Sequence, residues 1–140
     1  MKKLYFVFLI LIFSVFASGC LEKRVDPNTL TSTDERVLYD LMVARCHALN
    51  AKDMDQFRQI YTKDSPELKW IENTGIPMWK TNGMKFNEPS LKKISIIGND
   101  AAASFVLRGN NSFGTSFVYR VEVLYVKEGA QWKIESMGVR

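Results

Sequence analysis

The feature that most constrains the fold is a change of hydrophobic period near Pro89. Before it, apolar residues recur every three to four positions, as on one face of a helix. After it, residues 90–97, 101–108, 115–126 and 131–138 alternate as strands do, and Gly- or Asn-rich turns separate them. Helices followed by an antiparallel meander predict an α+β fold in which the helices pack on one face of the sheet.

Three predicted helices begin at recognisable caps. Ser32 opens a capping box that is completed at Glu35, and the helix is expected to run to about Asn50. Asp53 caps a second, shorter helix, and Ser65-Pro66 starts a third. The connection between the first two is short, so we expect those helices to be neighbours.

Alternation divides each strand into two faces. One face is expected to contact the helices and carries two matching rows: Phe117, Tyr119, Val121, Val123 and Tyr125, beside Ala101, Ala103, Phe105 and Leu107. Arg120 and Glu122 then face outward, although the reversed assignment, with this pair inside, stays open. The outer face also carries Val106, Val118 and Leu124, which predicts a homodimer formed through that face.

The N-terminus has the three parts of an export signal: Lys2 and Lys3, an apolar run over 4–16, and small residues before Cys20. Ala17-Ser18-Gly19-Cys20 resembles the lipobox of bacterial lipoproteins. The resemblance implies a signal peptide over 1–19 and an acylated Cys20 that anchors the protein to a membrane of the cell envelope. An ordinary secretory signal is the alternative.

The lipobox reading also sets the domain organisation. Polar residues over 20–31 predict a flexible lipidated tether, and 32–140 form one domain. Leu21, which is not acidic, favours the outer membrane if the cell is Gram-negative.

Composition disfavours two classes of function. Without Lys2 and Lys3, 17 basic side chains face 15 acidic ones and form no stripe, so nucleic-acid binding is not expected. One histidine and Cys46, unpaired once Cys20 is acylated, do not make a usual zinc site, so no metal or other cofactor is expected. His47 is expected to be exposed and Cys46 to be a packed thiol.

The order of these parts resembles the nuclear transport factor 2-like superfamily, which includes ketosteroid isomerases and SnoaL-type polyketide cyclases. The residues that carry the resemblance are Ala48 to Asp55, Phe57 and Tyr61, then Val121-Glu122-Val123 and Lys127 to Ile134. It implies a cone, or cystatin-like α+β roll: N-terminal helices in the concave face of a curved antiparallel sheet, often enclosing a pocket. It implies no single activity, because the fold hosts enzymes, binders and scaffolds.

Arg45 breaks the apolar face of the first helix between Leu41 and Leu49. A guanidinium there must snorkel, pair with an acid on the third helix, or bind an anionic ligand. Trp70, Trp79, Tyr119 and Tyr125 are either core residues or the lining of a pocket for an apolar ligand.

The predicted inward rows hold no carboxylate or imidazole, which an isomerase or cyclase needs to move a proton. We therefore expect a non-catalytic module that binds a small ligand or a protein. The alternatives are an enzyme that uses Glu67, Glu72 or Glu122, and a structural component of an envelope assembly.

Overall fold

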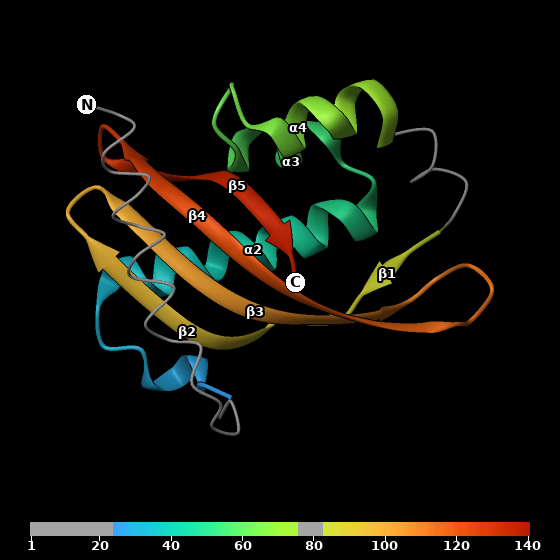
Figure 1. The fold of residues 1–140 in the computed structure, drawn as a ribbon, viewed down its shortest axis with the longest axis horizontal. Coiled ribbons are helices and arrows are strands. Elements are labelled where there is room, and N and C mark those ends of the chain that lie inside the picture. Colours follow the sequence, from blue (N-terminus) through green and yellow to red (C-terminus); the bar gives the residue numbers. More distant parts are fainter. Residues whose placement is uncertain (1–23, 76–82) are drawn as a thin grey trace.

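The computed structural model describes residues 24–75 and 83–140. Its helices precede its strands, and a five-stranded sheet fills the C-terminal half (Figure 1). The elements are η1 (Pro27–Thr29), α2 (Thr33–Ala51), α3 (Met54–Ile60), α4 (Pro66–Trp70), the π-helical turn η2 (Ile71–Gly75), β1 (Lys85–Phe86), β2 (Ser90–Ile97), β3 (Asp100–Asn110), β4 (Ser116–Glu128) and β5 (Gln131–Val139).

Side-chain caps fix the starts of the three α-helices, as predicted. The Ser32 hydroxyl accepts a hydrogen bond from the third backbone N–H of α2, at 3.3 Å. Asp53 and Ser65 do the same for α3 and α4, at 3.0 Å and 3.4 Å. Each cap satisfies an N–H group that the helix leaves without an internal partner.

The sheet is antiparallel and centred on β3 and β4. Ala101 pairs with Tyr125 and Leu107 with Tyr119, so the two predicted rows lie side by side. β5 flanks β4, while β2 and the short β1 share the other edge of β3. β1 was not expected from the sequence, because two residues are too few to show alternation.

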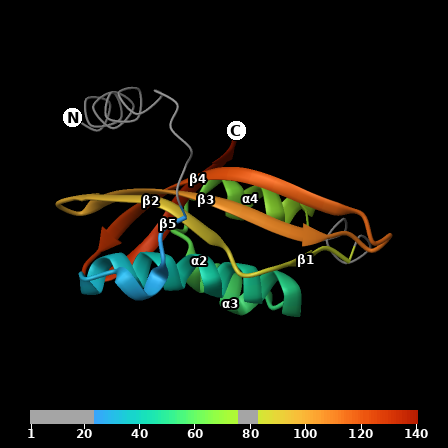
Figure 2. The ribbon, with the colours of Figure 1, turned by 90° about the horizontal axis from the view of Figure 1, so that it is seen from below.

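The helices cover one face of a curved sheet. Register shifts between Leu91 and Lys93 and between Leu124 and Tyr125 mark irregularities that favour bending of the strands. Figure 2 shows α2 and α3 on the same side of the sheet. The predicted fold class is confirmed. The best-buried core side chains, all at most 1% exposed, include Leu38, Met42, Phe57, Phe105, Val123 and Ile134.

The N-terminal segment joins the domain earlier than predicted. The backbone N–H of Val25 donates to the carbonyl of Leu91, at 2.9 Å, on the edge strand β2. Arg36 of α2 donates to the carbonyl of Pro27, and Leu30 packs against the core. A flexible tether that extends to residue 31 is therefore wrong for the residues from Val25 onward, because these contacts hold them to the domain.

The predicted signal peptide and Cys20 lie outside the described residues. Of the helices within residues 24–75 and 83–140, none has the length and apolar character that crossing a membrane requires.

Candidate functional site

Arg45 lies in the interior and joins two other side chains. Its Nη2 lies 2.6 Å from Oε1 of Glu67, and its Nε donates to the hydroxyl of Tyr61 at 2.7 Å. The Tyr61 hydroxyl in turn donates to the other carboxylate oxygen of Glu67, at 2.5 Å. We call Arg45, Tyr61 and Glu67 the interior cluster. The partner is an acid of the third helix, which was one of the alternatives for Arg45.

Three segments bring the interior cluster together. Arg45 projects from α2, and Tyr61 follows the last residue of α3. The backbone at Tyr61 bridges to Ile134 of β5, which holds this connection against the sheet edge. Glu67 belongs to the first turn of α4, whose start is fixed by the Ser65 cap. The caps that set the helix boundaries thus also position the cluster.

The protein surroundings keep each donor of the cluster protonated. Burial alone would lower the pKa of Arg45, but Tyr61 and Glu67 more than offset this and raise it above its ordinary value. Burial raises the pKa of Tyr61 well above its ordinary value. At neutral pH the cluster therefore contains a guanidinium cation and a neutral phenol that donates to the carboxylate.

One donor of the cluster is left over. Among the described residues, Arg45 Nη1 is buried and has no hydrogen-bond acceptor. The guanidinium carbon lies 5.9 Å from the centre of the Phe57 ring, a cation–π contact that does not replace an acceptor. A buried donor without an acceptor costs about 1–3 kcal/mol. An oxygen of a bound molecule placed at Nη1 would remove that cost.

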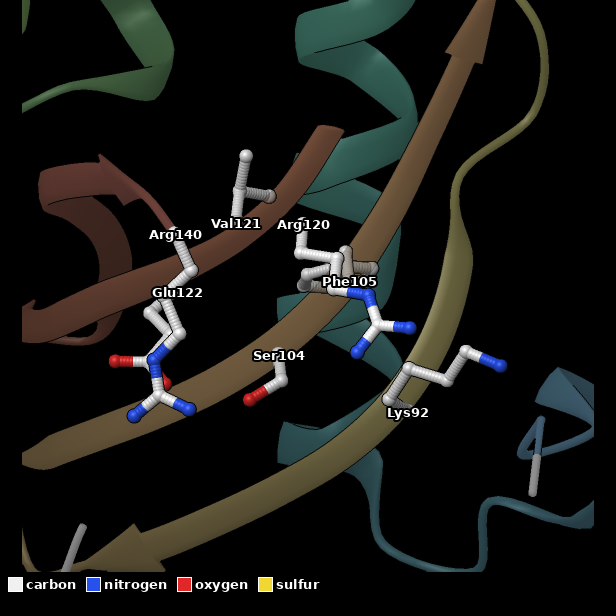
Figure 3. A pocket seen from close by; sticks show the side chains of 7 residues that line it. All are labelled: Lys92, Ser104, Phe105, Arg120, Val121, Glu122 and Arg140. Carbon is white, nitrogen blue, oxygen red and sulfur yellow. The ribbon is translucent and has the colours of Figure 1, made fainter. Parts of the chain in front are cut away.

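The other two acids considered for catalysis are also paired. Glu72 lies 2.7 Å from Arg58, and Glu122 lies 2.7 Å from Arg140. Glu122 and Arg120 line a hollow on the outer face of the sheet (Figure 3), so the reversed assignment of the strand faces is wrong. The reason is that Val121 and Val123, which alternate with them, fill the interior.

The aromatic candidates do not meet in one place. Tyr125 is buried and donates to the carbonyl of Leu38, at 3.1 Å. Tyr119 is 39% exposed and stacks on Phe117, with ring centres 5.0 Å apart. Tyr119 and Tyr125 are six positions apart along an extended strand, which corresponds to about 20 Å. Tyr125 is thus a core residue, while Tyr119 lies where the row leaves the core.

Trp70 lies outside the core, which was one of the two places expected for it. Its exposed fraction is 55%, whereas those of Leu68 and Ile71 are both 6%. These two residues anchor α4 and the turn that follows, and successive residues of a helix differ in direction by about 100°. Trp79 lies outside the described residues.

Cys46 and His47 have the environments predicted for them. Cys46 is 1% exposed, and burial raises the pKa of its thiol, with Arg45 acting in the opposite direction. A buried thiol of raised pKa is a poor nucleophile. His47 is exposed on α2. Within residues 24–75 and 83–140, no three His, Cys, Asp or Glu residues are grouped as metal ligands would be.

The sequence pattern singled out Arg45 but did not show that Tyr61 would be one of its hydrogen-bond partners. From the sequence, Tyr61 was named only among the residues that carry the family resemblance, with no role beside Arg45. A buried tyrosine hydroxyl usually finds a hydrogen-bond partner, and this general preference was the available signal.

No family model and no curated protein match this chain. Several solved structures resemble it. A domain of unknown function with a cystatin-like fold from Nostoc punctiforme has a TM-score of 0.64 and 15% identity, over 77% of this chain and 76% of that one. A nuclear transport factor 2-like protein of unknown function from Shewanella oneidensis has a TM-score of 0.60 and 15% identity, over 76% and 98%.

A third similar structure, a nuclear transport factor 2-like protein of unknown function from Pseudomonas putida, has a TM-score of 0.58 and 16% identity, over 79% of this chain and 87% of that one. At such identities the likeness shows the fold alone. The chain therefore has the nuclear transport factor 2-like, cystatin-like fold that the sequence analysis expected.

Proposed function

We propose that this protein is a lipid-anchored protein of the cell envelope whose domain is a non-catalytic binding module for a small molecule. The observation that carries the binding role is the state of the interior cluster. Both carboxylate oxygens of Glu67 accept hydrogen bonds from protein donors, while Arg45 Nη1 has no acceptor among the described residues. Such a cluster suits a ligand that offers an oxygen, and not a substrate that gives up a proton.

Catalysis of the isomerase or cyclase kind needs a base that can take a proton from carbon. Glu67, Glu72 and Glu122 each accept from an arginine at 2.6–2.7 Å. In each of them an arginine occupies an oxygen that a base would have to present to the carbon of a substrate. These pairings support binding over proton transfer.

Lipid anchoring rests on the signal at residues 1–20, which the structure does not describe. Mass spectrometry of the mature N-terminal peptide tests it. We expect a Cys20 N-terminus that carries a diacylglycerol and an amide-linked acyl chain, and a Cys20→Ala variant that leaves the membrane fraction. An unmodified Cys20 inside a longer chain would contradict the anchor.

Native mass spectrometry tests the binding role. The chain from residue 21 onward, produced in the envelope and purified gently, is expected to retain a small molecule with a carbonyl, carboxylate or similar acceptor. Arg45→Lys keeps a cation for Glu67 but lacks the second terminal N–H group, so this variant should stay folded and lose the molecule. Conversion of the retained molecule to a product, abolished by Glu67→Gln, would overturn the proposal.

A further inference from the structure

The outer face of the sheet carries a small, mostly cationic hollow, away from the interior cluster. Its lining holds three cationic side chains, Lys92, Arg120 and Arg140, against one carboxylate, Glu122. Figure 3 shows the hydroxyl of Ser104 between them and the side chain of Arg120 extending towards the strand that carries Lys92.

The strand register concentrates positive charge around this hollow. Lys93 pairs with Ser104 across β2 and β3, so it belongs to the same face as the hollow. Arg140 follows β5, and its backbone N–H donates to the carbonyl of Arg120 at 2.9 Å, which places these two residues side by side. Four cationic residues from three parts of the chain therefore share this region of the sheet with Glu122.

The size and chemistry of the hollow select for a small oxyanion. The hollow has a volume of about 50 Å³, whereas pockets for small organic ligands measure roughly 300–1,000 Å³. Guanidinium, ammonium and hydroxyl groups are the donors that bind phosphate oxygens. A phosphate group that is part of a larger molecule or surface fits this hollow, because only the phosphate has to enter it.

The path of the chain determines which phosphates lie within reach. Val25 is bonded to Leu91, the residue before Lys92. Val25 lies only five positions after Cys20, and five steps of fully extended chain span at most about 18 Å. If Cys20 is acylated, as proposed above, this edge of the sheet stays within that distance of the lipid headgroups.

We propose that the outer face, centred on Lys92, Arg120 and Ser104, docks on the phosphate headgroups of anionic lipids in the membrane that holds the anchor. The inference rests on the proposed anchor for the proximity of the bilayer, but the affinity for headgroups belongs to the face itself. A tethered surface meets its partner at high effective concentration, so weak contacts suffice to orient the domain. The face opposite the helices then lies on the membrane.

Sedimentation with vesicles tests this proposal without the lipid anchor. The chain from residue 21 onward retains every described residue, and so the whole described core. Vesicles of phosphatidylcholine alone are compared with vesicles that contain about 30% phosphatidylglycerol. We expect at least about tenfold stronger partition into the anionic vesicles, decreasing as salt is added.

A pair of matched double variants tests the location. Lys92→Glu/Arg120→Glu should remove most of the preference for anionic vesicles. Lys63→Glu/Lys69→Glu makes the same change of net charge at two exposed residues, one between α3 and α4 and one on α4. This control should keep most of the preference for anionic vesicles. Urea unfolding of each variant confirms that both are folded.

Four results would overturn the proposal: equal partition into both vesicles, no binding to either, equal loss in both double variants, or a dimer that only Lys92→Glu/Arg120→Glu dissociates. The last would assign the face to a second copy of the chain. Binding of inorganic phosphate without vesicle binding would reassign the hollow to free phosphate. Retention of a ligand by the interior cluster and acylation of Cys20 are measured separately, so failure here is distinguishable from failure of the proposed function.

Discussion

Arg45 and Glu67 join α2 to α4 through the interior of the domain, with Nη2 and Oε1 2.6 Å apart and their side chains 6% and 13% exposed. Both groups have lost most of their contact with water. A buried ion pair of this kind is tolerated only while it is complete, because either partner alone is an uncompensated charge. The pair is therefore a structural requirement as well as the centre of the candidate site.

Removing Glu67 should destabilise the protein strongly. Glu67→Ala leaves a buried guanidinium without its counter-ion and a Tyr61 hydroxyl without its acceptor. We expect the free energy of unfolding to fall by about 3–5 kcal/mol, measured by urea denaturation. Asp40→Ala is the control, since it breaks the exposed Arg36–Asp40 pair at 3.5 Å and should cost at most about 1 kcal/mol. Similar losses of unfolding free energy in the two variants would show that the interior pair contributes no more to stability than an exposed pair.

Gly109 is expected to tolerate no side chain. A Cβ there would lie 1.9 Å from the carbonyl oxygen of Lys85 and 2.6 Å from Cζ of Phe117. Relieving the first clash requires a shift of the β1 backbone against β3. Gly109→Ala should therefore lower the free energy of unfolding by about 1–3 kcal/mol. Gly138→Ala in β5 is the matched control, because a Cβ at Gly138 has nothing within 4 Å. If Gly138→Ala lowered the free energy of unfolding as much as Gly109→Ala does, the argument would be contradicted.

Alkaline pH should unfold the protein through its tyrosines. Burial, with the hydrogen bond to Glu88, raises the pKa of Tyr39 to about 12, and burial raises the pKa of Tyr61 and Tyr125. In the unfolded chain these groups ionise near pH 10. Above that pH the unfolded state loses protons that the native state keeps, so stability is complete below about pH 10 and decreases as the pH rises towards 12.

Urea denaturation between pH 9 and pH 11.5 measures this dependence, and absorbance of tyrosinate follows ionisation directly. Tyr39→Phe should flatten the decrease, because it removes one of the three shifted groups. A native protein whose three tyrosines all ionise near pH 10 without unfolding would show that they are not held as the structure describes.

Local chemistry made much of the fold predictable. Ser32, Asp53 and Ser65 begin three helices as expected, because a capping side chain binds the backbone next to it and needs no distant contact. Period-two alternation on both sides of a short turn placed the rows of Ala101 and Tyr125 on one face, and the structure adds the register that pairs these two residues. The start of the domain at Val25 was not predictable in this way, since it depends on a backbone bond to β2.

The site was less predictable, because it depends on distances between elements. Arg45 stood out as a charge on an apolar helix face. This pattern indicates that Arg45 has a partner, but it does not show whether the partner is Glu67 or a bound anion. Tyr119 and Tyr125 share one row, but alternation does not reveal where the helices cease to cover that row. The exposure of Trp70 was not predictable from the sequence. A helix of five residues shows no clear periodicity, so contacts with the rest of the core determine which of its faces is buried.

The most direct test of the account is a high-resolution crystal structure of the gently purified protein, inspected at Arg45. We predict an acceptor atom of a bound molecule about 3 Å from Arg45 Nη1, with Glu67 still accepting from Arg45 and Tyr61. A Glu67 carboxylate that has left Arg45 and lies against a carbon of the bound molecule would contradict the account, because that is the geometry of a base poised to take a proton.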